Sequence, residues 1–322
     1  MRQNTSVIVP LYNKGKTIRR CLASVLQQTN KNFEIIVVDD GSEDQGPDIV
    51  RGFQDTRIRL VRQKNSGVSS ARNRGIKEAD NHWISFLDAD DEWVPETLDY
   101  LSGALEQYPQ ADVAFGAMLW RKGVKTKRKP PVGWVLGEGE VMGIIEDFFV
   151  KYAEEYFVTV CAMLVRKEVF KKVGVFNERL RHGEDGELIS RIAGYTDCVF
   201  VDRELMIYNR DVPGSISSRS RGDIKNLFDN EKMRRLIRES LWPSYQLFRA
   251  KRALTVAKGI VGQVELQCLG EALALVEPHL RNRTYWFVVI LSKLPKPLRI
   301  TIVKIIRTIK SLGRKLMGKE VF

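Results

Sequence analysis

The sequence predicts an α/β fold, in which helices flank a mostly parallel sheet and a helical, basic extension follows at the C-terminal end. Two observations support this prediction. Short β-branched apolar runs alternate with amphipathic stretches over the first 120 residues, which is the pattern of strands joined by crossover helices. Polar clusters follow these runs, and the carboxyl ends of parallel strands meet at one edge of a sheet, where ligands bind.

The expected elements follow this alternation in order. Strands are expected at 6–9, 33–38, 58–62, 83–87 and 113–118, and helices at 16–28, 47–54, 68–78 and 95–107. Pro95 suits the first turn of the last of these helices. The basic stretch from Trp120 to Gly139 contains Pro and Gly, so we expect a loop or an irregular hairpin there. The remaining expectations are a helix near 141–152, a strand near 160–165, a helical pattern that ends at Ala193, and apolar runs at 198–201 and 205–208.

The length of 322 residues exceeds the usual size of one domain. We therefore expect an α/β body over residues 1–220, a helical extension over 221–280 and a basic amphipathic tail over 281–322. Residues 212–222 are rich in Ser, Arg and Gly, which is typical of a mobile flap.

The net charge of +12 belongs mainly to the tail, where eleven Lys and Arg stand against a single Glu from residue 281 onward. Apolar residues recur there at three- and four-residue spacings, which predicts a basic amphipathic helix on an anionic membrane surface. Docking on the body and homodimerisation are the alternatives. Nucleic-acid binding is disfavoured because no stacking aromatics interleave the basic residues from Ile300 on. The apolar run at 286–294 is shorter than the roughly 20 residues of a membrane span.

The four cysteines are widely separated and form neither a CxxC pair nor part of a His-rich cluster. This arrangement favours free thiols in a reducing compartment over a disulfide framework or a structural zinc site. No basic segment followed by an apolar stretch precedes the first strand, so we expect no signal peptide. The expected location is the cytoplasm.

Two pairs of carboxylates follow predicted strands. Asp88 and Asp90 end the run at 83–87, and neighbouring carboxylates repel one another unless a positive charge lies between them. Mg or Mn bridging a diphosphate would satisfy them, and a solvated acidic turn is the alternative. Asp39 and Asp40 end the run at 33–38, where they are placed to accept hydrogen bonds from a nucleobase or ribose, or to form an Asx turn.

Taken together, these clusters resemble the family 2 glycosyltransferases with the GT-A (Rossmann-like) fold, over roughly residues 5–217. The resemblance implies an inverting, non-processive enzyme, and the processive members' QxxRW motif is missing here. Each motif is weak alone, but the five occur in the order and spacing of the family. They are SVIVPLYNKG at 6–15, IIVVDDGSED at 35–44, NSGVSSARNRGI at 65–76, ISFLDADDEWVP at 84–95 and GEDGELISR at 183–191.

The resemblance implies a donor site at the strand ends. Pro10 and Tyr12 would border the base, and Asp39 would accept a hydrogen bond from the uracil NH. Arg72 would lie near the base and phosphates, and Asp88 would hold the ribose side. UDP is the favoured nucleotide, although dTDP carries the same NH.

The resemblance also implies a metal site and a base. Asp90 would coordinate Mn or Mg together with Asp88, and Asp91 could share that role. Asp185, beside Glu184, would be the general base that takes the proton of the acceptor hydroxyl. The alternative for both acidic residues is capping of a helix N-terminus.

The sequence departs from the family pattern in two places. Gly186 stands where many members have an aromatic residue, so the acceptor side is expected to be less aromatic. The stretch from Tyr208 to Ser215 lacks the His that many members place there as a metal or phosphate contact. Arg210 and Arg219 are candidate phosphate contacts or solvated loop residues.

The sequence therefore predicts a hexosyltransferase that uses a nucleotide-sugar donor and a lipid-linked or envelope glycan acceptor at the inner face of the cell membrane. A bacterial cell-surface polysaccharide pathway would fit. A nucleotidyltransferase and a catalytically silent sugar-nucleotide-binding scaffold are the alternatives. No GxGxxG or P-loop motif occurs, which disfavours a dehydrogenase or an NTPase.

Overall fold

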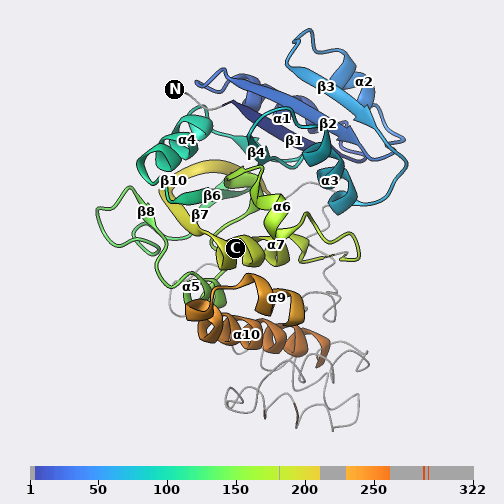
Figure 1. The fold of residues 1–322 in the computed structure, drawn as a ribbon. Coiled ribbons are helices and arrows are strands. Elements are labelled where there is room, and N and C mark those ends of the chain that lie inside the picture. The colour runs from blue at the N-terminus through green and yellow to red at the C-terminus, as the bar shows by residue number, and fades with distance from the viewer. Residues whose placement is uncertain (1–3, 181, 211–229, 262–285, 287–288, 290–322) are drawn as a thin grey trace.

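The computed structural model describes residues 4–180, 182–210, 230–261, 286 and 289. Its centre is an open sheet with the strand order β3-β2-β1-β4-β9-β6-β10-β5, while β7 pairs with β6 and β8 with β10 (Figure 1). Helices cover both faces, so the predicted fold class is confirmed. The strands are β1 (Thr5–Leu11), β2 (Phe33–Asp39), β3 (Ile58–Arg62), β4 (Trp83–Phe86), β5 (Glu92–Trp93), β6 (Ala111–Lys122), β7 (Lys125–Lys129), β8 (Met142–Ile144), β9 (Met163–Arg166) and β10 (Asp197–Asn209).

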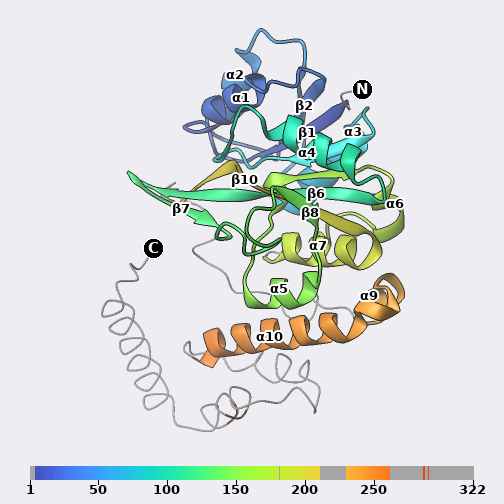
Figure 2. The same cartoon turned by 90° about the vertical axis from the view of Figure 1, so that its left-hand side faces the viewer.

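Helices lie on both sides of the sheet, and α10 packs on α5 (Figure 2). In Figure 2, α1, α2 and α4 lie on one side of the sheet, and α5, α7 and α10 lie on the other. Gly75 of α3 permits a close approach to the sheet, because a Cβ at this position would lie 2.3 Å from Ile8 of β1. The helices are α1 (Ile18–Leu26), α2 (Gly46–Arg51), α3 (Val68–Glu78), α4 (Thr97–Gln107), α5 (Phe148–Glu154), α6 (Val169–Val173), α7 (Glu184–Tyr195), α9 (Asn230–Leu236) and α10 (Trp242–Val261).

The first four strands in the chain pair with one another in parallel. β1 pairs in parallel with β2 and β4, and β2 with β3. Val7, Ile8 and Val9 of β1 are fully buried, because helices cover both faces of this part of the sheet. Such continuous β-branched runs are the reason why β1 and β2 could be recognised in the sequence.

The direction of the later strands decides where the site lies. β9 is antiparallel to both β4 and β6, so β6 runs in the same direction as β4. β10 is parallel to β6. The carboxyl ends of β1, β2, β4, β6 and β10 therefore lie at one edge of the sheet.

The second half of the chain differs from the expected elements in three places. The helix expected over 141–152 is wrong in its first half, because Met142–Ile144 pairs with β10 as β8 and Asp147 is left-handed, with φ 50°. The apolar runs at 198–201 and 205–208 are one strand, interrupted by register shifts around Glu204. The basic stretch after Trp120 begins as a regular hairpin.

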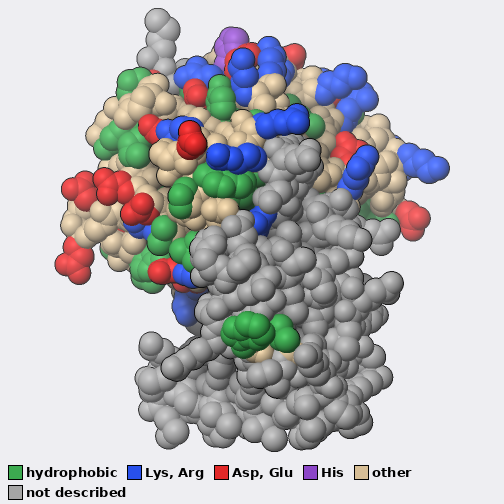
Figure 3. All heavy atoms as spheres, turned by 60° about the horizontal axis from the view of Figure 1, so that its bottom comes forward, with side chains coloured by type: hydrophobic (Ala, Val, Ile, Leu, Met, Phe, Trp, Pro, Cys, Tyr) green, Lys and Arg blue, Asp and Glu red, His purple; other side chains and the backbone are tan. Residues whose placement is uncertain are grey.

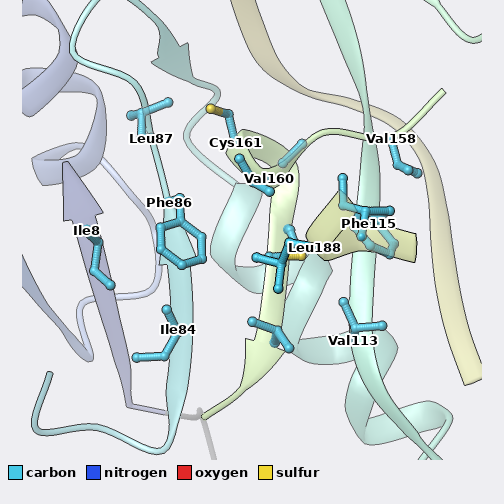
Figure 4. Packing of buried hydrophobic residues seen from close by; sticks show 14 of the residues in the cluster. Ile8, Ile84, Phe86, Leu87, Val113, Phe115, Val158, Val160, Cys161 and Leu188 are labelled. Carbon is cyan, nitrogen blue, oxygen red and sulfur yellow. The ribbon is translucent and has the colours of Figure 1, made fainter. Parts of the chain in front are cut away.

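A tightly packed core supports the loop after β4. Ile84 and Phe86 of β4 and Val113 and Phe115 of β6 lie on either side of the segment that carries Val160 (Figure 4). Phe86 makes edge-to-face contacts with two further rings, with centroids 5.3 and 6.3 Å away. The described cysteines, Cys21, Cys161 and Cys198, are buried free thiols.

The described part of the C-terminal extension packs on the body through aromatic side chains. The rings of Tyr152 on α5 and Phe248 on α10 are stacked with centroids 5.0 Å apart, and Phe149 lies 5.2 Å from Tyr245. Residues 211–229, which include the predicted flap and Arg219, lie outside the described part, as does the tail from 281 apart from residues 286 and 289. The domain division therefore stays a prediction.

The face turned forward in Figure 3 carries charges of both signs. On the described part of this face, Lys and Arg side chains are interspersed with Asp and Glu (Figure 3). Among the described helices, none combines the length and the apolar character needed to cross a membrane.

Candidate active site

A buried arginine joins three of the predicted site residues. Arg72 on α3 is 2% exposed, and its guanidinium lies 2.8 Å from Asp88 Oδ1, 2.7 Å from Asp185 Oδ1 and 3.2 Å from Glu184 Oε1. Its Cζ atom also lies 5.1 Å from the centre of the Phe176 ring. Burial lowers the pKa of Arg72, but the three carboxylates outweigh it and hold that pKa well above its usual range. The guanidinium therefore stays charged and joins α3, the end of β4 and the start of α7.

The acidic side chains in this cluster outnumber the arginine. Burial, followed by the charges of Glu184 and Asp88, raises the pKa of Asp185 to about 7, although Arg72 opposes the shift. Asp185 is still 34% exposed, so a substrate can reach it. A carboxylate with a pKa near neutrality is suited to accept a proton at physiological pH.

The start of α7 is held in place from within. Gly183 precedes the helix with φ 83°, which favours glycine, and Glu184 and Asp185 occupy the first turn. Arg191 is fully buried, pairs with Glu187 and donates to the carbonyls of 173–175. These bonds fix the turn that carries Asp185.

Asp91 is the carboxylate whose surroundings best fit a cation. It is 1% exposed; its Oδ1 accepts from the Asn209 backbone at 2.9 Å, and its Oδ2 has no hydrogen-bond partner among the described residues. Burial, then Asp88 and Asp90, raises the pKa of Asp91 well above its usual range. A buried, unpaired carboxylate oxygen beside further carboxylates is stabilised by a bound cation.

The residues around Asp91 differ in how well they could bind a cation. Ligand atoms of Asp88, Asp91 and Cys161 lie within 4.8 Å of one another. Burial, then Asp88 and Asp91, raises the pKa of the Cys161 thiol, so it stays protonated, and a thiol is a poor ligand for Mg or Mn. The Asp90 carboxylate is bonded to Lys14 Nζ at 2.5 Å. The oxygen donors of Asp88 and Asp91 therefore fit a hard divalent cation best.

Asn209, at the end of β10, holds the loop of residues 88–91, called the acidic loop below, by hydrogen bonds. Besides its backbone bond to Asp91, its side-chain amide donates to the Asp90 carbonyl at 2.8 Å and accepts from Arg121 Nε at 2.8 Å. Asn209 is buried and lies in the stretch that lacks the His found in many family members. Asn209 therefore holds this loop in place through its backbone NH and its side-chain amide.

The ends of β1 and β2 meet at the same edge. Asp39 is fully buried; its Oδ1 accepts from the Ser42 backbone at 2.9 Å, and its Oδ2 lies 3.2 Å from Arg62 Nε without hydrogen-bond geometry. Asn13 donates to the Ser42 hydroxyl, and the next residue, Lys14, pairs with Asp90. Pro10 is half-buried at the end of β1 and Tyr12 is 46% exposed just beyond it.

A hollow and a second carboxylate, Asp40, lie beside Asp39. The hollow has a volume of about 610 Å³ and is lined by Gly41 and residues 62–65. Asp40 accepts hydrogen bonds from the backbone of Ser66 and Gly67, at 2.8 Å each. Asp40 thereby fixes the loop before α3, and so the position of Arg72. The local bond resembling the expected Asx turn is made by Asp39, whose Oδ1 accepts from the Ser42 backbone three residues on, whereas Asp40 binds the backbone of a loop distant in the chain.

Tyr156 occupies the space beside Gly186. A Cβ at residue 186 would lie 2.6 Å from the Tyr156 hydroxyl oxygen and 3.2 Å from Cε1. An aromatic ring from the segment after α5 thus lies next to the helix start that carries Asp185. Sequence reasoning missed this ring because the two positions are far apart in the chain.

We expect Gly186→Ala to lower the free energy of unfolding by about 1 kcal/mol, because the added methyl group forces the Tyr156 ring to move. Chemical denaturation would measure this. Tyr156→Phe removes the closest atom, so it should restore most of the loss in the double variant. An equal loss from Gly186→Ala in the Tyr156→Phe background would show that the hydroxyl is not the obstacle.

The structure brings most of the predicted site residues together. Arg72, Asp88, Glu184 and Asp185 are in direct contact. Asp90 and Asp91 follow in the same loop, and Asp39 is joined to them through Ser42, Asn13 and Lys14. The residues that sequence reasoning missed are Lys14, Asn209, Tyr156 and Cys161. Of these, Lys14 and Asn209 stood inside motifs that we had singled out.

Comparison with known proteins gives concordant results. The family model described as glycosyl transferase family 2 matches residues 6–174. GlyA of Streptococcus pneumoniae, a glycosyltransferase, is 41% identical over 34% of this chain and 16% of its own length. EpsJ of Bacillus subtilis, an uncharacterized glycosyltransferase, is 32% identical over 66% of this chain and 62% of its own length. The chain thus spans less than two thirds of the length of each of these two relatives.

Solved structures show the same fold. The crystal structure of residues 1–349 of S. aureus TarS in complex with UDP-GlcNAc has a TM-score of 0.72 and 19% identity. The match covers 97% of this chain and 92% of that one. The glycosyltransferase GlyG of Streptococcus pneumoniae is 30% identical over 65% of this chain and 72% of its own length. The family model matches just over half of the chain, and the family motifs lie together at one edge of the sheet. The chain therefore belongs to glycosyl transferase family 2.

Proposed function

We propose that this glycosyltransferase moves a sugar from a UDP-sugar to an acceptor hydroxyl with inversion, and that Asp185 is the general base. The observation that carries the proposal is the contact of Asp88, Glu184 and Asp185 with the buried guanidinium of Arg72. TarS, which shares the fold, binds UDP-GlcNAc, and this supports the choice of uridine. The acceptor that we propose is a lipid-linked or envelope glycan at the inner face of the cell membrane.

The chemistry requires one proton transfer by the protein. Asp185 takes the proton of the acceptor hydroxyl while the hydroxyl oxygen attacks the anomeric carbon of the sugar. The bond from that carbon to the diphosphate oxygen breaks, and the diphosphate leaves. No covalent intermediate with the protein forms. Arg72 keeps Asp185 in place, and Glu184 helps to raise its pKa.

We assign the cation, Mn or Mg, to Asp88 and Asp91, with Asp90 beside them. When bound, the cation neutralises negative charge on the leaving diphosphate. On the donor side, we assign Asp39 to the uracil NH, because its buried Oδ2 has no hydrogen-bond donor among the described residues. Pro10 and Tyr12 border the base at the same edge. Tyr156 provides the aromatic wall on the acceptor side that Gly186 lacks.

A donor screen tests the proposal. Thermal shift with UDP-, dTDP- and GDP-sugars, each with Mn or Mg, identifies the donor, because a ligand that binds the folded state raises its stability. Release of UDP from that donor, with transfer to an acceptor glycan, supports the glycosyltransferase. Donor binding without turnover on any acceptor would favour a scaffold. Consumption of an NTP with pyrophosphate release would favour a nucleotidyltransferase.

We expect kcat/KM to fall about tenfold per pH unit below about pH 7 and to be flat above it. Burial and neighbouring carboxylates raise the pKa of Asp185 to about 7, and only the deprotonated form accepts a proton. Initial rates between about pH 5.5 and 8.5 would show this limb, and its midpoint should move to lower pH as Mn is raised, because a cation on Asp88 offsets one of the charges that raise the pKa of Asp185. The matched control is Asp185→Asn, whose residual rate should lack the limb. An unchanged rate down to the acidic end of this range contradicts the assignment.

A further inference from the structure

The hairpin of β6 and β7 is a second basic surface, separate from the tail. Residues 121–129 contain six Lys and Arg and no acidic residue. The register pairs Lys122 with Lys125 across the ladder, which places like charges directly opposite each other and destabilises a hairpin. The hairpin extends well beyond the rest of the sheet (Figure 2).

The two faces of this hairpin differ in chemistry. Directly opposed residues of an antiparallel pair point to the same face. The pairs Leu119–Arg128 and Arg121–Thr126 therefore share one face, on which Arg128 contacts Asp202 and Glu204. Arg121 contacts Glu92 and Asn209. This arginine face holds the hairpin on the body.

The opposite face carries lysines. The pairs Trp120–Lys127, Lys122–Lys125 and Met118–Lys129 lie on it. Lys122, Lys125 and Lys127 are exposed, while Lys129 lies 5.2 Å from the centre of the Trp120 ring. The hairpin thus separates arginines that hold it on the body from three exposed lysines, Lys122, Lys125 and Lys127, while Lys129 pairs with Glu155.

The tip of the hairpin is apolar. Val124 follows Gly123, which has φ 56°, and its side chain is fully exposed, at 101%. An apolar tip surrounded by lysines matches the interface of an anionic bilayer, where the apolar group enters the headgroup layer and the ammonium groups meet lipid phosphates. A soluble polyanion would use the lysines but leave the apolar tip without a partner.

The hairpin also lies on the side of the molecule where transfer occurs. β6 runs parallel to β10 and to β4, so the hairpin leaves the sheet at the edge that carries the Asp88–Asp91 loop. Arg121 at its base bonds to Asn209, which bonds to the Asp90 carbonyl. We propose that the tip and lysine face of the β6–β7 hairpin dock on an anionic phospholipid surface and bring this edge of the sheet to the membrane.

A label at the tip tests this contact independently of the tail. In full-length Cys268→Ser protein, Val124→Cys is labelled with an environment-sensitive fluorophore, since the three described cysteines are buried. We expect a blue shift with vesicles of phosphatidylglycerol and phosphatidylcholine but not with phosphatidylcholine alone. Val175→Cys, on another exposed segment, is the matched position and should not shift.

Charge reversal supplies the second measurement. Lys122→Glu, Lys125→Glu and Lys127→Glu together should abolish the shift and lower vesicle binding at least about tenfold. Reversal of the exposed Lys31, Lys77 and Lys172 should do neither. Release of UDP with a water-soluble acceptor should be unchanged in both triple variants, which separates this proposal from the proposed function. A tip label that stays in water while the chain binds vesicles overturns the proposal, as does a shift with soluble polyphosphate alone.

Discussion

Asp185→Asn is expected to lower kcat by about 10²- to 10⁴-fold while the Kd of the donor stays nearly unchanged. The amide has the same shape and can still accept the hydrogen bond from Arg72 Nη1, so the contact at 2.7 Å is kept. It cannot take up a proton from the acceptor at neutral pH. The loss should therefore appear in turnover and not in binding.

Steady-state rates of UDP release and calorimetric titration of the donor would measure the two quantities. Glu184→Gln is the neighbouring comparison, and we expect a smaller loss because its contact with Arg72 is longer, at 3.2 Å. Glu168→Gln, an exposed carboxylate just before α6, should behave as wild type. If Asp185→Asn kept more than half of the wild-type kcat, another group would have to be the base.

Asp91→Asn is expected to have opposite effects on activity and on the stability of the cation-free protein. Loss of a carboxylate ligand should weaken Mn binding at least about 100-fold and lower turnover at limiting Mn accordingly. The same change removes a buried carboxylate that Asp88 and Asp90 repel, so the cation-free variant should be at least as stable as wild type. A residue with a purely structural role would lower both quantities.

The raised pKa of Asp91 also predicts how the stability of the cation-free protein depends on pH. The pKa of Asp91 is raised in the folded state, so folding binds a proton in the range above the unfolded pKa of about 4. The free energy of unfolding of cation-free protein should therefore fall as pH rises from about 5 to 8, and less steeply in Asp91→Asn. Saturating Mn should remove much of this slope in wild type. Chemical denaturation at several pH values, with EDTA or with Mn, would measure this dependence. An equal slope of unfolding free energy against pH in wild type and Asp91→Asn would show that Asp91 is not responsible.

Local patterns were sufficient for the N-terminal half of the fold. The runs that became β1 and β2 are rich in β-branched residues and almost fully buried, and α3 spans Val68–Glu78 as its periodicity predicted. The helix expected over 141–152 failed because Met142–Ile144 pairs with β10, a partner more than fifty residues away. Such pairing depends on which edge is available in the folded sheet, and no local spacing encodes it.

The same division applies to the site. The sequence by itself determined that carboxylates follow β2 and β4 and begin α7, because the end of an apolar run and the start of a helix are local signals. Only the tertiary structure decided their partners: Arg72 meets Asp185 across 113 positions, Asn209 fastens Asp91, and Tyr156 lies beside Gly186. The charge and pKa of each carboxylate depend on those partners, since electrostatic interaction follows distance in space and burial, and neither is set by neighbours along the chain.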